Sequence, residues 1–122
     1  MNIILWILQV LLAAQFVFHG WIFAAPPAEM VEAMNTFIPS WLRIFIGVAE
    51  LLAAAGLILP GATRILPWLT PLAAAGLMIV TASAAGLHLS RGETGNAVYT
   101  AVLFVLVTIV AYMRWKVRPI SP

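Results

Sequence analysis

The chain has 122 residues, of which 64% are hydrophobic and only 8% are charged, and its formal net charge is +2. Soluble domains carry about 25% charged residues, so six basic and four acidic side chains are too few to cover a soluble fold of this size. This excludes an ordinary soluble enzyme, a disordered chain and a free nucleic-acid-binding protein. The absence of cysteine also excludes disulfides and thiolate metal sites. The composition is typical of an integral membrane protein.

Four apolar stretches are each long enough to cross a bilayer core, which takes roughly 20 apolar helical residues. In chain order they run over residues 3–25, 41–59, 67–89 and 96–113. Pro26-Pro27 ends the first and Pro60-Gly61 closes the second, because proline lacks an N–H and clashes inside a helix. We therefore predict one all-α domain over residues 1–122, a bundle of four transmembrane helices.

The connections between the spans differ in charge. Residues 26–40 contain Glu29 and Glu32, three positions apart, and suit a short amphipathic helix on the membrane surface; a simple connecting loop is the alternative. The 60–66 link and the 114–122 tail are basic. Lys and Arg accumulate on the cytoplasmic side, and four spans place both termini on one side. We therefore expect both termini in the cytoplasm and the bundle in a bacterial-type plasma membrane.

With this topology, all four spans place polar side chains in the outer half of the membrane. The candidates for a ligand-binding site are Gln15 and His19 in the first span, Arg43 and Glu50 in the second, His88 in the third and Tyr99 in the fourth. Gln15 and His19 are four residues apart, so they lie on one face of the first helix. Arg43 and Glu50 are seven residues apart, so they lie on one face of the second. The inner half is nearly pure hydrocarbon apart from Gln9 and Thr108. Gln9 and Gln15 both suit hydrogen bonds between helices.

Glu50 is the most informative candidate, because apolar residues flank it on both sides. Ionisable groups inside a membrane cost about 2.5–3.5 kcal/mol each on insertion scales, and they face a partner or a cavity. Two interpretations stay open: Glu50 bonds to Arg43 or a histidine and only locks the bundle, or it lines a cavity for a ligand or a proton. Arg43 either extends to the outer interface or holds Glu50, an anion or a carbonyl group. His19 and His88 likewise suit structural hydrogen bonds.

The second span carries a more specific pattern, Arg-x3-Gly-x2-Glu-Leu-Leu-x3-Gly-Leu-x2-Pro, which begins at Arg43. It resembles the second helix of the DoxX-like family of small four-helix membrane proteins, and the resemblance covers most of the chain. Family members often have Gly followed shortly by Lys at the outer end of the first helix, where this chain has His19-Gly20 and no lysine. The residues that the resemblance assigns to a polar site are Arg43, Gly47, Glu50 and His88.

The resemblance implies a link to quinol oxidase and thiosulfate–quinone oxidoreductase complexes, although most members have no assigned activity. Three functions are compatible with it. The first is a redox-associated subunit that binds a quinone-like or other lipid-soluble molecule. The second is a non-catalytic accessory or assembly module, or a binder of an amphiphile. The third is a small proton-coupled carrier that acts as an oligomer, with Glu50 as the proton site.

These functions differ in the cofactors and partners that they require. The chain has no redox centre of its own, so a partner or a bound cofactor must supply electrons. A quinone fits this role, but haem does not, because His19 lies about 9 Å and His88 about 2 Å below the outer edge. We expect no metal site and no nucleic-acid partner. The expected partners are the bilayer, a small lipid-soluble ligand, and further copies of the chain or a larger redox complex. The sequence assigns no catalytic residue and does not decide whether the chain is an enzyme.

Overall fold

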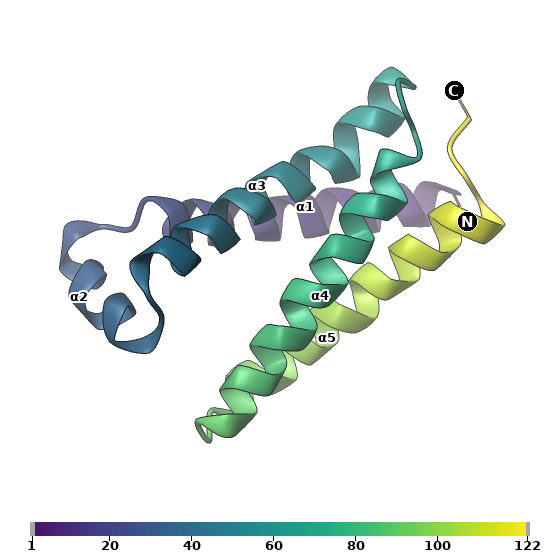
Figure 1. Ribbon diagram of the computed structural model, residues 1–122. Coiled ribbons are helices and arrows are strands. Elements are labelled where there is room, and N and C mark those ends of the chain that lie inside the picture. The colour runs from purple at the N-terminus through teal and green to yellow at the C-terminus, as the bar shows by residue number, and fades with distance from the viewer. Residues whose placement is uncertain (1, 122) are drawn as a thin grey trace.

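The computed structural model describes residues 2–121, which are almost entirely helical and contain no strand. In chain order the elements are α1 (Asn2–Ala24), α2 (Ala28–Phe37), α3 (Ser40–Thr63), α4 (Leu69–Ser90), α5 (Thr94–Tyr112) and a short π-helix, η1 (Met113–Val117) (Figure 1). Four helices in this part of the chain are long and apolar enough to cross a membrane. The predicted all-α bundle is confirmed. The ends of the predicted 1–122 domain, Met1 and Pro122, lie outside the described residues.

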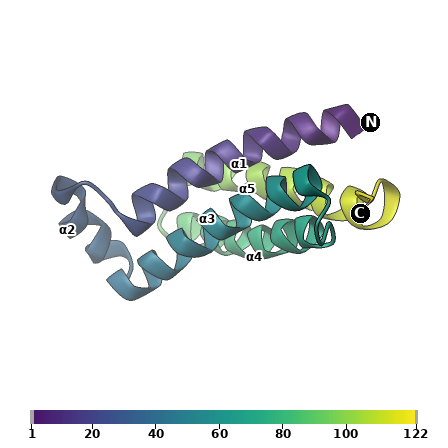
Figure 2. The ribbon, with the colours of Figure 1, turned by 90° about the horizontal axis from the view of Figure 1, so that it is seen from above.

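The four long helices form two antiparallel pairs, α1 with α3 and α4 with α5. Further contacts join α3 to α4 and α1 to α5. The pairs lie close together at the end that carries both termini and diverge toward the end that carries α2 (Figure 1). Seen from above, α2 projects beyond the bundle (Figure 2). These two ends are called the terminal end and the α2 end below.

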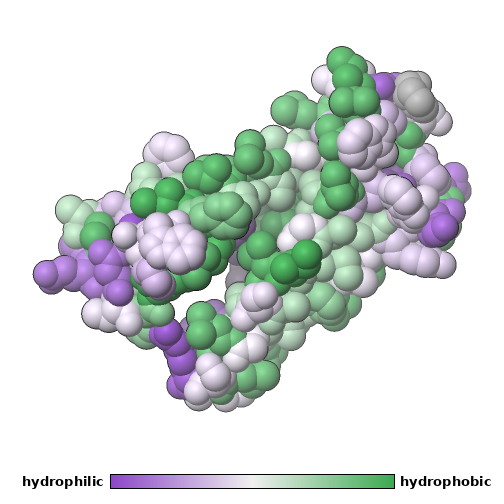
Figure 3. All heavy atoms as spheres, in the orientation of Figure 1, coloured by the Kyte–Doolittle hydropathy of each residue, from purple (hydrophilic) through white to green (hydrophobic). Residues whose placement is uncertain are grey.

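The core lies nearer the terminal end, because the diverging pairs share little interior at the α2 end. Its largest fully buried apolar side chains are Leu5, Leu57, Leu77, Val107 and Val110. By contrast, α4 buries no residue after Thr81. Large apolar side chains cover much of the outer surface, as contact with lipid requires (Figure 3).

The short helix predicted between the first two spans is present as α2, so the alternative of a simple loop is wrong. None of its residues is buried. Arg91, in the turn between α4 and α5, donates a hydrogen bond from Nη2 to the carbonyl oxygen of Phe37 over 2.6 Å. Its guanidinium also lies 4.6 Å from the centre of the Phe37 ring, in a cation–π contact. This contact links the two helix pairs at the α2 end.

The structure corrects the predicted end of the second span. Pro60 lies inside α3, which continues to Thr63 and ends at Arg64 in the left-handed conformation (φ 58°, ψ 24°). A proline has no N–H to donate to the carbonyl four residues earlier, which here belongs to Gly56. The hydroxyl of Thr70 on α4 donates to that carbonyl over 2.9 Å. The helix therefore tolerates Pro60 because a neighbouring helix supplies the missing donor.

Replacing Thr70 with valine is expected to lower the free energy of unfolding by about 1–2 kcal/mol, because the half-buried carbonyl of Gly56 loses this donor. Thr108→Val is the matched control. The hydroxyl of Thr108 bonds to the carbonyl of Phe104 in its own helix, which the helical N–H of residue 108 also serves. Unfolding of both variants in detergent by SDS titration measures the difference. Equal losses would show that the hydroxyl of Thr70 does not compensate for Pro60.

The other helix bounds shift by a few residues. The third long helix begins at Leu69, after Pro67, and not at the predicted residue 67, because Pro67 and Trp68 form the turn that precedes it. The fourth begins at Thr94, two residues before the predicted start, and the helical segment continues through η1 to Val117, past the predicted residue 113. The predicted basic tail thus begins inside a helical segment.

Arg114 explains that extension, because it is buried and not part of an exposed tail. Its side chain is 2% exposed, and its Nε donates to Oε1 of Gln9 over 2.7 Å. The Nε2 of Gln9 donates in turn to the carbonyl of Leu57 over 2.6 Å. The predicted role of Gln9 between helices is confirmed. The prediction of a nearly pure hydrocarbon interior at this end is wrong, because it omitted this arginine.

Candidate functional site

α1 and α3 cross at two glycines, Gly20 and Gly47. A Cβ atom added to Gly47 would lie 2.6 Å from the backbone nitrogen of Ala24 and 2.7 Å from the carbonyl oxygen of Gly20. A Cβ atom added to Gly20 would lie 2.8 Å from the carbonyl oxygen of Gly47. The two backbones are therefore in direct contact, which only the smallest residues permit. This crossing presses the adjacent turn of α3, which carries Glu50, against α1.

Glu50 lies in this contact and pairs with His19 of α1. The Nδ1 atom of His19 is 2.9 Å from Oε1 and 3.0 Å from Oε2 of Glu50. The carboxylate is almost completely buried, with 1% of the side chain exposed, whereas the side chain of His19 is 43% exposed. The prediction that Glu50 faces the interior within reach of Arg43 or a histidine is confirmed, with His19 as the partner.

The pair fixes the chemistry of the imidazole ring. With Nδ1 held by the carboxylate, the neutral ring presents Nε2 as an acceptor, and the imidazolium presents Nε2–H as a donor. Within residues 2–121, the hydrogen bonds of this ring run through Nδ1. Phe23 packs beside the ring, with the two centroids 4.3 Å apart. The Nδ1 edge of His19 is therefore anchored, whereas its Nε2 makes no hydrogen bond within residues 2–121.

Arg43 is buried against the neighbouring helix, with 4% of its surface exposed. Its Nη1 donates to the carbonyl oxygen of Phe23, in the last turn of α1, where helix carbonyls lack intrahelical partners. The predicted alternative of an Arg43–Glu50 pair is wrong, because the guanidinium of Arg43 donates to the carbonyl oxygen of Phe23 instead. The Nε of Arg43 is buried and has no hydrogen-bond partner within the described chain. Phe23 thus connects Arg43 with His19.

Gln15 and Tyr99 form a second contact near this site. The hydroxyl of Tyr99 on α5 donates to Oε1 of Gln15 on α1. Gln15 and His19 lie one helical turn apart on the same face of α1. The face of α1 that carries His19 is therefore the face that approaches α5, at the level where the helix pairs begin to diverge.

Comparison with known protein families bears on these contacts. The chain matches the model of the DoxX-like family over residues 7–110, which include the glycine crossing, the His19–Glu50 pair and the Gln15–Tyr99 contact. The chain belongs to the DoxX-like family. It is an integral membrane protein with four spans, as the apolar helices also indicate. The comparisons found no match among curated proteins and none among solved structures.

In this DoxX-like protein, His88 does not join Glu50. Its Nδ1 lies 2.9 Å from Oε1 of Glu93, in the turn between α4 and α5. Glu93 was not among the predicted residues. Its position five residues after His88, across a turn with Gly92 at a φ of 72°, is the sequence signal for this local pair. The structure therefore separates His88 from the remaining candidates, which lie along the contacts of α1 with α3 and α5.

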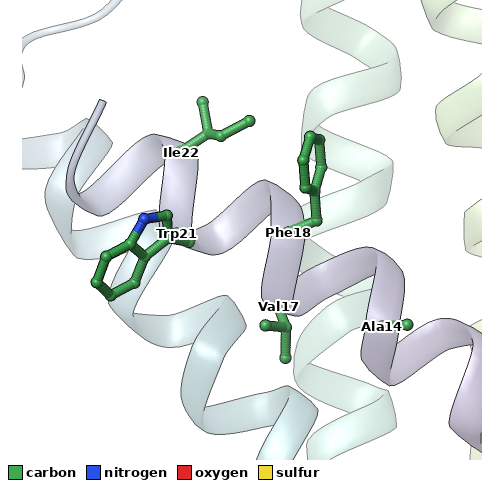
Figure 4. Close-up of a pocket in the computed structure, with 5 residues that line it drawn as sticks. All are labelled: Ala14, Val17, Phe18, Trp21 and Ile22. Carbon is green, nitrogen blue, oxygen red and sulfur yellow. The ribbon is translucent and has the colours of Figure 1, made fainter. Parts of the chain in front are cut away.

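An apolar hollow on the outside of α1 was also missed. It has a volume of about 470 Å³ and is lined by Ala14, Val17, Phe18, Trp21 and Ile22 (Figure 4). Their spacing of three or four residues, with the small Ala14 at one end, is the sequence signal for it. None of the six predicted site residues lines this hollow, so the DoxX-like chain presents an apolar surface and a polar pair on different faces of α1.

Proposed function

We propose that this DoxX-like protein binds a quinone-like, lipid-soluble molecule at the His19–Glu50 pair and acts as a subunit associated with a redox system. The observation that carries the proposal is a buried carboxylate whose partner histidine remains 43% exposed. A pair that only locked two helices together would gain nothing from an accessible ring. A buried acid that holds an accessible imidazole is suited to proton exchange with a ligand.

The surroundings of the pair fit a ligand that enters from the lipid. The molecular surface is hollowed between the α2 end of the α1–α3 pair and the α4–α5 hairpin (Figure 3). The Gln15–Tyr99 contact crosses between the two pairs on one side, and the Arg91–Phe37 contact crosses at the α2 end. The side chain of His19 is 43% exposed, and Gln15, one turn earlier on α1, contacts Tyr99 of α5. Apolar helices on either side would cover a hydrocarbon tail.

The proposed chemistry uses only the proton-handling groups of the chain. A bound quinone supplies the ring that accepts electrons, which come from a partner protein. The imidazolium form of His19 would hold a carbonyl oxygen of the quinone through Nε2–H and would supply one of the two protons that reduction to the quinol takes up. Glu50 stabilises the charged ring before the transfer and holds the neutral ring in place afterwards. Arg43 carries a further donor, its buried Nε, which has no partner within the described chain. Phe23 links Arg43 to the pair, because its carbonyl accepts from Arg43 and its ring packs against His19.

We further infer that the terminal end faces the cytoplasm of a bacterial-type plasma membrane. Arg64, Arg114, Lys116 and Arg118 lie at this end, whereas the four acidic residues lie toward the α2 end. This distribution follows the positive-inside tendency. A reporter fused to the C-terminus that is active only outside the cytoplasm would contradict this orientation.

Mass spectrometry of the lipid extract from the purified protein tests the proposed ligand. A quinone is expected to co-purify with the native protein and to fall about tenfold in Glu50→Gln and His19→Gln, since each removes a charge-assisted hydrogen bond. His88→Gln is the matched control and should retain the quinone. Another amphiphile in its place would favour the accessory or amphiphile-binding function, for which the apolar hollow on α1 is the supporting observation.

A further inference from the structure

A second polar site lies at the terminal end, far along the bundle from the His19–Glu50 pair. It is a pocket of about 280 Å³ between the start of α1, the end of α3 and the tail. The lining residues are Asn2, Trp6, Gly61, Arg64, Arg118, Pro119, Ile120 and Ser121. Two arginines and the polar side chains of Asn2 and Ser121 therefore face a cavity large enough for a small anionic group.

Arg114 lies directly against the wall of this pocket. Its Nη1 donates to Oδ1 of Asn2 over 2.7 Å and to the carbonyl oxygen of Arg118 over 3.0 Å. Its guanidinium also lies 5.6 Å from the centre of the Trp6 ring. All three of these partners belong to residues that line the pocket. The site thus combines two lining arginines with a third that is 98% buried (2% exposed) and packed behind them.

The buried arginine has one donor to spare. The Nη2 of Arg114 is buried and has no hydrogen-bond partner among residues 2–121. Arg114 does not itself line the pocket, so its guanidinium places a positive charge behind the pocket wall, and this charge favours an anion in the pocket.

The electrostatics of the terminal end favour an anion. The four basic residues of this end are accompanied by no acidic side chain, because Glu29, Glu32, Glu50 and Glu93 all lie toward the other end. The first turn of α1 begins at Asn2, which lines the pocket, so the positive end of the helix dipole adds to the field. Arginine forks match the tetrahedral oxygens of a phosphate group and bind them in pairs.

We propose that this pocket binds a phosphate-bearing anion at the membrane surface, the chemistry that the headgroup of an acidic phospholipid presents. Arg64 and Arg118 hold the phosphate oxygens, and Arg114 holds the pocket wall through Asn2 and the carbonyl of Arg118. Basic pockets among membrane helices recognise acidic headgroups in this way. The site is independent of the proposed quinone function, because it shares no residue with the His19–Glu50 pair.

The test uses the purified full chain in detergent, with phosphatidylglycerol and phosphatidylcholine as probes in native mass spectrometry. The double variant Arg64→Gln/Arg118→Gln removes both lining charges, and Lys116→Gln removes an exposed charge at the same end that does not line the pocket. The native protein should prefer phosphatidylglycerol. That binding should weaken about tenfold or more in the double variant and less than about twofold in Lys116→Gln.

A second arm identifies the source of the phosphate and checks the fold. Far-UV circular dichroism should show unchanged helicity in every variant, since the substituted side chains are exposed. Inorganic phosphate, added without lipid, should raise the melting temperature of the native protein and not of the double variant if a soluble anion is the ligand. Selective binding of phosphatidylglycerol with no response to inorganic phosphate identifies the lipid. The proposal is overturned if neither probe distinguishes the native protein from the double variant, or if Lys116→Gln weakens binding as much as the double variant.

Discussion

Replacing Gly47 with alanine is expected to lower the free energy of unfolding by about 3 kcal/mol, because the added methyl group meets backbone that has no room to move. The new Cβ would lie 2.6 Å from the nitrogen of Ala24 and 2.7 Å from the carbonyl oxygen of Gly20. Both are atoms of α1, so relief requires the whole helix to move away from α3. That movement would also draw His19 away from Glu50, so ligand binding should fall together with stability.

Gly76→Ala is the matched control for this substitution. Gly76 lies in the interior of α4, and a Cβ added there meets no atom within 4 Å. Alanine forms helix better than glycine, so this variant should be neutral or slightly more stable, by up to about 1 kcal/mol. SDS titration of both variants, followed by circular dichroism, gives the comparison. Similar stabilities for the two variants would refute the crossing at Gly20 and Gly47.

Arg114→Met is expected to lower the free energy of unfolding by about 3 kcal/mol, because it leaves the buried Oε1 of Gln9 without its donor and removes the packing against Trp6. The substitution also releases Asn2, and with it the start of α1, from the tail. Lys116→Met, at an exposed position two residues away, should change stability by less than about 0.5 kcal/mol.

The double variant Gln9→Leu/Arg114→Met separates the hydrogen bond from general packing. When both partners of a buried hydrogen bond become apolar, neither of the two is left unsatisfied, and the loss of that bond can be nearly neutral. We therefore expect the double variant to recover at least half of the stability that Arg114→Met loses. A double variant less stable than Arg114→Met would show that the Arg114–Gln9 bond is not what holds the tail to the bundle.

The four spans and α2 were predictable from the sequence because they depend on local properties, namely apolar length and helical spacing. Two of the points at which the prediction failed depend on a partner that belongs to another helix. Pro60 normally ends a helix, and only Thr70 on another helix explains why α3 continues. Arg114 has the sequence context of an exposed basic tail, and its burial rests on Gln9, 105 residues earlier.

The candidate site was predictable only in part, because the burial of a residue follows from its local sequence whereas the choice of its partner does not. A carboxylate in an apolar span requires a partner, so the burial of Glu50 followed from its position. The choice of His19 over Arg43 depends on how α1 and α3 cross at Gly20 and Gly47, and neither helix alone contains that information. His88 was assigned to the site by depth and family pattern, whereas its partner is Glu93 in the adjacent turn.

The central claim is that His19 and Glu50 act as one ligand-binding unit, and a double-mutant cycle with a short-chain quinone tests it most directly. The dissociation constant is measured in detergent for the native protein, His19→Gln, Glu50→Gln and the double variant, with His88→Gln as the control. Each single variant should bind about tenfold more weakly. The double variant should bind no more weakly than either single variant, because a pair that acts as a unit is lost with its first member. Additive losses in the double variant, or an equal loss in His88→Gln, would contradict the account.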